Sequence, residues 1–230
     1  MYGDSGDSKA PMGEMVERGI ALGLGQMCFT EHMDFDFPVS EGIPKGFFEV
    51  NTDAYLYELL RCRAVYGDRI KLCFGVELGL QAYLAEVQEG YVNSFPFDFI
   101  IGSSHLCNGK DPYDAGFFAG RSEEEAYREY FGSIIDNLEE FHDFDIYGHL
   151  DYVVRYGPDQ DKFYTYEKYR DLFELKRYRE LGGEIVTVGS DAHRPEDICR
   201  EFKRAEEFLR DCGFSYYTVF DKRTASFIKL

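Results

Sequence analysis

Short apolar runs alternate with amphipathic stretches along most of this chain. Runs rich in β-branched and aromatic residues predict buried strands, at 27–30, 71–76, 97–102, 145–148, 184–188 and 216–220. Apolar positions at helical spacing predict the helices between them, at about 8–22, 52–66, 82–91, from 122 onward, 166–181 and 195–212. Strands that alternate with helices predict right-handed βα units around a parallel sheet or barrel. We expect one α/β domain spanning residues 1–230.

Polar residues at the predicted helix starts support these boundaries. Asp7 or Ser8 can cap the first helix, and Asn51 or Thr52 can cap the second. Ser122 precedes three glutamates at the spacing of a capping box.

Residues that can bind metal follow the predicted strands one after another. The first four strands are followed by His32, Glu77, His105 and His149. A single histidine after a strand is more often structural, but a parallel sheet or barrel brings the carboxyl ends of its strands to one rim. Histidine and carboxylate ligands without cysteine favour Zn²⁺, Mn²⁺ or Fe²⁺. The pattern predicts a metal centre that could activate water and hold phosphate oxygens.

The run Gly189–Pro195 follows the 184–188 strand and contains Asp191 and His193. A carboxylate and an imidazole beside Arg194 suit a metal ion and an anionic substrate, although a polar turn with a helix cap fits this run equally well. Arg155 is a second candidate for phosphate binding. A surface ion pair is the alternative for that arginine in so acidic a protein.

Composition narrows the choice of partner. The 230 residues are 44% hydrophobic, and 43 acidic against 25 basic residues give a net charge of −18. Without a basic stripe, binding to nucleic acid or to an anionic membrane is not expected. The long loop at 33–51 is either a substrate lid or a surface excursion.

The six cysteines and the polar N-terminus indicate a compartment. The cysteines show no zinc-type spacing, and several lie in apolar runs, which is typical of reduced thiols. No signal-peptide core is visible, and no run reaches the roughly 18 apolar residues that span a bilayer. We expect a cytoplasmic protein. A GxSxG elbow, a P-loop and a GxGxxG motif are all absent from the sequence.

An ordered set of motifs resembles one known family. The segments are Gly6–Pro11, Phe29–Asp34, Gly75–Glu77, Gly102–His105, Gly148–Asp151 and Gly189–His193. Together they resemble the PHP (polymerase and histidinol phosphatase) superfamily, and within it the monofunctional histidinol-phosphatase branch. The likeness covers nearly the whole chain.

The resemblance implies a distorted TIM-like (β/α)7 barrel with up to three divalent metals (Zn, Mn or Fe) at its carboxyl rim. In the family pattern Glu77 bridges two metals, and Glu77, Asp191 and His193 are expected to be catalytic. The metal ligands implied here are, in chain order, Asp7, His32, Glu77, His105, His149, Asp191 and His193.

The implied reaction is hydrolysis of L-histidinol phosphate to L-histidinol and phosphate in histidine biosynthesis. Arg155 and Arg194 match positions that bind the substrate phosphate in this branch. The expected partner is therefore a small-molecule phosphoester.

Two departures from the family pattern are visible. Family members carry a strand that ends in His-x-His about six residues before the aspartate that Asp7 resembles. Counting back from Asp7 puts the second histidine at or just before Met1, so both histidines are absent. Near Phe173–Lys176 the family has a further strand between two helices, which run together here. We therefore expect a barrel lacking its first strand and one later strand, with one metal site impaired. The alternatives are a truncated or vestigial PHP domain with weak or no activity, and a PHP phosphoesterase acting on another small phosphoester.

Overall fold

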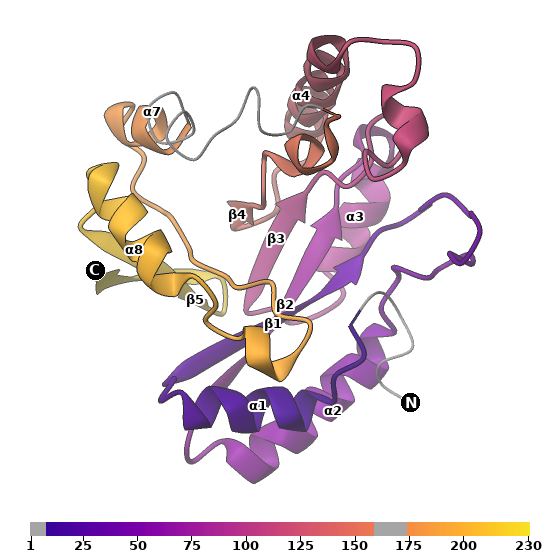
Figure 1. The fold of residues 1–230 in the computed structure, drawn as a ribbon. Coiled ribbons are helices and arrows are strands. Elements are labelled where there is room, and N and C mark those ends of the chain that lie inside the picture. Colours follow the sequence, from indigo (N-terminus) through magenta and orange to yellow (C-terminus); the bar gives the residue numbers. More distant parts are fainter. Residues whose placement is uncertain (1–7, 159–173) are drawn as a thin grey trace.

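A parallel four-stranded sheet forms the centre of the protein. The computed structural model describes residues 8–158 and 174–230. The strands follow the order β1-β2-β3-β4, which is also their order in the chain: β1 Gln26–Met33, β2 Lys71–Gly79, β3 Phe99–Ser103 and β4 Ile146–Tyr147 (Figure 1). All neighbouring pairs are parallel. This arrangement confirms the predicted α/β class and accounts for four of the strands expected in the barrel.

Helices lie around this sheet (Figure 1). The α-helices are α1 Met12–Ala21, α2 Thr52–Tyr66, α3 Ala85–Val92, α4 Glu123–Glu140, α7 Glu174–Glu180 and α8 Phe202–Asp211. Short 3-10 helices are η1 Ala82–Leu84, η2 Ala115–Phe118, η3 Tyr152–Tyr156 and η4 Pro195–Asp197. The helices expected from the first 158 residues are confirmed. The start of the helix expected at 166–181 lies outside the described residues.

Two of the predicted helix caps are confirmed. The Asn51 side chain accepts a hydrogen bond from the Ala54 amide, and Ser122 and Glu125 form a complete capping box. The first helix differs from expectation, because its N-cap is Pro11 and no side chain caps it. Proline at this position costs no hydrogen bond, since the first amides of a helix have no intrahelical acceptor. Asp7 lies outside the described residues.

Strand β2 is the most buried strand, and every residue of it after Lys71 is buried. Tyr55 of α2, itself fully buried, donates its hydroxyl to the Phe29 carbonyl of β1 and the Gly75 carbonyl of β2 at 2.8 and 3.0 Å. Phe74 stacks on Phe97 with 4.6 Å between ring centroids. This packing fixes the register of β1 against β2, and in that register His32 is the direct partner of Glu77.

The C-terminal part departs from three expectations. Residues 184–188 belong to no strand, and the Val186 carbonyl accepts instead from the Thr218 amide at 2.7 Å. One hydrogen bond to a neighbouring strand does not make this run a strand, because a strand needs a repeated ladder of such bonds. The predicted closing strand is confirmed as β5 Tyr216–Asp221, but it pairs with an unpredicted strand, β6 Thr224–Lys229, in an antiparallel hairpin.

The helix expected at 195–212 is broken into η4 and α8. Cys199 and Glu201 between them have φ values of 62° and 60°, a left-handed backbone that interrupts a helix. Ile198 is extended there and only 6% exposed. Burying such a side chain contributes about 2 kcal/mol, which helps to offset the lost helical hydrogen bonds. In the part of the chain that the structure describes, no helix is long and apolar enough to cross a membrane.

Candidate metal centre

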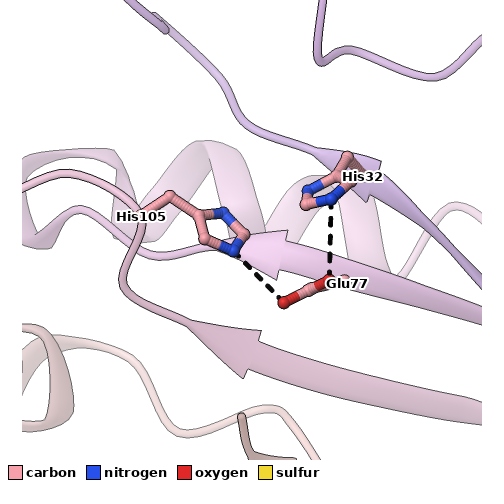
Figure 2. Close-up of side chains that lie close together, drawn as sticks. All are labelled: His32, Glu77 and His105. Carbon is pink, nitrogen blue, oxygen red and sulfur yellow. Dashed lines mark hydrogen bonds and ion pairs between the residues drawn. The ribbon is translucent and has the colours of Figure 1, made fainter. Parts of the chain in front are cut away.

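Three residues predicted to bind metal converge at the carboxyl ends of adjacent strands. His32 comes from β1, Glu77 from β2 and His105 from the segment directly after β3, and their ligand atoms all lie within 4.8 Å of one another. The carboxylate of Glu77 faces both rings: its Oε1 lies 3.2 Å from His105 Nε2 and its Oε2 lies 3.8 Å from His32 Nε2 (Figure 2). The parallel register thus brings together side chains that are far apart in the sequence.

A fourth predicted ligand joins this group. His149 follows β4, and its Nε2 lies 2.9 Å from Glu77 Oε1 and 3.3 Å from His105 Nε2. We call His32, Glu77, His105 and His149 the strand-end cluster. His142, expected within a helix, is exposed and follows the end of α4.

The donor atoms of the strand-end cluster fit a divalent cation. The Nε2 atoms of His105 and His149 and one oxygen of Glu77 face one another within 3.3 Å. The Nδ1 of His149 is buried and has no hydrogen-bond partner among the described residues. Several electron-pair donors that share one small volume are stabilised when a cation takes the place of a proton between them, and imidazole with carboxylate suits zinc and its neighbours.

Charge interactions keep the carboxylates of this region ionised. Burial by itself raises the pKa of Glu77, but hydrogen bonds from His105 and His149 outweigh it and hold that pKa well below its usual value. Burial by itself lowers the pKa of His105, but the carboxylates of Asp34 and Glu77 outweigh burial and raise that pKa well above its usual value. A carboxylate is therefore ready to bind a cation, and the cation must displace protons from the histidines.

Asp34 is the residue of this region that the sequence analysis did not assign. It lies just beyond β1, it is 3% exposed, and its carboxylate contacts the Nδ1 atoms of both His32 and His105. The interactions with those two histidines overcome the effect of burial and lower the pKa of Asp34 to about 2. The one feature of the sequence that points to this contact is the position of Asp34, an acid two residues after His32.

The loop at 33–51 supplies Asp34 and also an aromatic wall. Phe48 lies edge-on to His32 with ring centroids 5.7 Å apart, and Phe37 and Phe47 pack against Phe48. Backbone bonds tie the loop to the strand, from the Asp34 amide to the Phe48 carbonyl and from the Val50 amide to the His32 carbonyl. The loop therefore packs directly against one predicted ligand.

The other predicted ligands lie in the Gly189–Pro195 segment. His193 Nδ1 lies 2.8 Å from the Asp191 carbonyl and 3.9 Å from its carboxylate, and Ser8 donates to the His193 carbonyl. The Asp191 side chain is 66% exposed, and its φ is 46°. The structure thus describes two groups: the strand-end cluster and this Asp191–His193 pair. Asp7 lies outside the described residues.

The two predicted phosphate-binding arginines are both exposed. The Arg155 guanidinium lies over the Tyr152 ring, 5.9 Å from its centroid. That ring in turn lies against His105 and His149, with centroid distances of 5.5 and 5.3 Å. The Tyr152 ring therefore contacts both the Arg155 guanidinium and the two histidines of the strand-end cluster. Arg194 immediately precedes η4, and η4 packs against α1 (Figure 1).

The fold and the strand-end cluster define an α/β protein with a histidine and carboxylate group, suited to a divalent metal, at the ends of parallel strands. The chain belongs to the PHP domain family, whose model matches residues 4–183. Within that family it belongs to the histidinol-phosphatase branch.

Two comparisons support this placement. Histidinol-phosphatase of Lactococcus lactis is 30% identical over 249 residues, which cover 94% of this chain and 90% of that protein. A crystal structure of histidinol phosphate phosphatase from L. lactis, complexed with Zn, L-histidinol and phosphate, matches with a TM-score of 0.86 and 29% identity, covering 97% of this chain and 95% of the other.

A solved structure from Listeria monocytogenes has a TM-score of 0.57 at 17% identity, covering 84% of this chain and 93% of the other, and this likeness shows the fold alone. The 249 positions aligned with the L. lactis protein exceed the 230 residues of this chain. That relative therefore contains internal residues without a counterpart here. Whether they correspond to the gap expected near Phe173–Lys176 stays a prediction.

Proposed function

We propose that this protein is a metal-dependent phosphomonoesterase that hydrolyses L-histidinol phosphate to L-histidinol and phosphate, a reaction of histidine biosynthesis. One observation carries the proposal. The strand-end cluster occurs in a chain that matches, over nearly its whole length, a histidinol phosphate phosphatase crystallised with Zn, L-histidinol and phosphate. A small phosphoester in the cytoplasm is the partner that this proposal requires.

The cations would be held by the residues that face one another at the strand ends. His32, Glu77, His105 and His149 supply three imidazoles and one carboxylate. Asp191 and His193 are proposed as ligands from the Gly189–Pro195 segment, and Asp7 as another. Divalent cations such as Zn²⁺, Mn²⁺ or Fe²⁺, up to three in the family, acidify water and neutralise charge on phosphoryl oxygens when bound.

The arginines would bind the phosphate. A phosphomonoester carries close to two negative charges near neutral pH, and the net charge of this protein is −18, so local cations are needed. A guanidinium matches phosphate geometry with two parallel N–H donors. Arg155, held over Tyr152 beside two histidines, and Arg194, next to His193, are the proposed phosphate-binding residues.

The catalytic roles proposed for Glu77, Asp191 and His193 depend on the charge of their side chains. Glu77 remains ionised because of its hydrogen bonds with His105 and His149, so its carboxylate can bind cations at neutral pH. Asp191 and His193 complete the catalytic set by bringing a second carboxylate and imidazole to the phosphate.

Phosphate release from L-histidinol phosphate is the test. We expect turnover by the purified protein that is lost after chelation and restored by Zn²⁺, Mn²⁺ or Fe²⁺. Parallel assays with other small phosphoesters and with 5′-phosphorylated oligonucleotides define the substrate class. Undiminished hydrolysis by metal-free protein, or faster release from oligonucleotides, would overturn the proposal.

A further inference from the structure

Asp34 lies between two predicted metal ligands and contacts both. Its Oδ2 is 3.0 Å from His32 Nδ1, and its Oδ1 is 2.6 Å from His105 Nδ1. Each carboxylate oxygen of Asp34 is therefore within hydrogen-bond distance of one imidazole. The side chain is 3% exposed, so water does not compete strongly for either contact.

The opposite nitrogen of each imidazole faces Glu77. His105 Nε2 lies 3.2 Å from Glu77 Oε1, and His32 Nε2 lies 3.8 Å from Glu77 Oε2. When a cation takes the place of the Nε2 proton, an imidazole that still donates Nδ1–H to one carboxylate presents the lone pair of Nε2 on its other side. The two acids thus bracket the two rings, with Asp34 on the Nδ1 side and Glu77 on the Nε2 side.

The backbone fixes Asp34 in this place. Its amide donates to the Phe48 carbonyl at 2.9 Å, which ties it to the far end of the loop. Because both the carboxylate and the amide are held, Asp34 can restrict the rotation of two rings that come from different strands.

Gly79 provides the room that the Asp34 carboxylate occupies. A Cβ atom built on Gly79 would lie 2.0 Å from Asp34 Oδ1 and 2.7 Å from its Cγ, closer than any real contact. The Gly79 backbone is not in the left-handed region, so conformation does not require glycine here. Gly79 is two residues beyond Glu77 in β2, on the same face of the strand. The space for Asp34 is therefore built into the strand that carries the central carboxylate.

We propose that Asp34 is a positioning residue of the metal centre, and that Gly79 is the residue that makes room for it. Asp34 holds His32 and His105 with Nδ1 protonated and with Nε2 directed toward the cation. Such outer partners of histidine ligands typically change metal affinity by about 10- to 100-fold. This inference rests on the metal-binding part of the proposed function and is independent of the substrate.

The first test is Zn²⁺ binding to Asp34→Asn, measured by competition with a chelator well below the melting temperature. We expect dissociation constants raised by about 10- to 100-fold, because the amide can no longer accept from both rings. The matched control is Asp98→Asn. Asp98 is also buried, at 8% exposed, and its carboxylate accepts hydrogen bonds from the Phe74 amide and the Arg63 guanidinium. It lies just before β3, at the opposite end of that strand from His105. The control should lose stability and keep its Zn²⁺ affinity.

Gly79→Ala is the second variant, because it keeps every ligand and Asp34 itself but pushes the carboxylate away. We expect the same direction of change in Zn²⁺ affinity. Zn²⁺ affinity within about twofold of wild type in folded Asp34→Asn would overturn the proposal and leave Asp34 a stabilising residue only.

A measurement on the wild-type protein keeps the proposal falsifiable if neither variant folds. In the Zn²⁺-loaded protein, ¹H–¹⁵N spectra of the imidazoles should show protonated Nδ1 on both His32 and His105. Zn²⁺ bound through Nδ1 of either ring would overturn the proposal. All these readouts are metal affinity or ring protonation, so they remain decisive even if the protein does not hydrolyse L-histidinol phosphate.

Discussion

The strand-end cluster and the Gly189–Pro195 segment differ in what holds their side chains. His32 and Glu77 are register partners in a buried sheet, with side chains 22% and 9% exposed. Asp191 and His193 lie on a segment without strand pairing, with side chains 66% and 31% exposed. A ligand fixed by sheet register is in place before any cation binds, whereas a ligand on an exposed segment is ordered largely by what it binds. We therefore expect the strand-end cluster to hold the cation and the segment to act mainly in turnover.

The substitution with the largest expected effect removes the charge at the centre of the cluster. In Glu77→Gln we expect phosphate release to fall by about a thousandfold or more, since a bound metal supplies several kcal/mol of charge stabilisation. Metal content should fall with it, as measured by elemental analysis of the purified protein.

Glu86→Gln is the control for this prediction, because Glu86 is an exposed acid on α3. It should keep both metal and activity. Full metal content in active Glu77→Gln would show that the strand-end cluster is not the principal site.

The Gly189–Pro195 segment is tested by Asp191→Asn. We expect phosphate release to fall by about 100-fold, as for the loss of one metal-binding partner. The free energy of unfolding should change by only about 0.5 kcal/mol, because the side chain is exposed. Metal bound at the strand-end cluster should remain.

Asp197→Asn is the matched control, since Asp197 lies in adjacent η4 and pairs with Arg200. It should retain turnover. If Asp191→Asn instead emptied the strand-end cluster, the two groups would form one cooperative unit and the comparison would fail.

The strand-end cluster could be predicted from the sequence because its determinants are local. Apolar runs followed by histidine or glutamate mark buried strands and their ends, and parallel pairing brings those ends together. His32, Glu77, His105 and His149 were found in this way, and the structure places them side by side. The structure confirms that these four lie together, while the ligand roles predicted for them and for Asp7, Asp191 and His193 stay predictions.

Non-local features escaped prediction. Residues 184–188 have the composition of a strand, but pairing depends on what lies beside them, and no strand forms. Asp34 follows a strand in a loop with no periodic pattern, so its contact with His105, 71 positions away, left no signal in the sequence. Strand β6, by contrast, is local, because it pairs with the directly preceding β5 in a hairpin. The break before α8 falls at Cys199 and Glu201, whose left-handed backbone is not marked by a glycine in the sequence.

The two arginines test whether both regions contact the substrate. In Arg155→Lys and Arg194→Lys we expect the KM for L-histidinol phosphate to rise by about tenfold, because lysine cannot make the two parallel hydrogen bonds of a guanidinium. Metal content should not change. Arg200→Lys is the control, since Arg200 is exposed and pairs with Asp197. An unchanged KM in Arg194→Lys alone would leave phosphate binding to Arg155 and the metal centre.

The smallest expected effect compares how readily the buried sheet and the chain just after η4 expose a cysteine to solvent. Burial raises the pKa of Cys73 in β2 to about 11, and this thiol is fully buried. Burial also raises the pKa of Cys199, which lies after η4 and is partly exposed. Since only the thiolate reacts, alkylation of Cys73 at pH 8 should be slow and should accelerate as the pH rises toward 11. We expect iodoacetamide to label Cys199 first, measured by peptide mass spectrometry. Equal labelling rates at pH 8 would mean that the sheet opens as readily as the chain around Cys199, and the proposed rigidity of the strand-end cluster would be wrong.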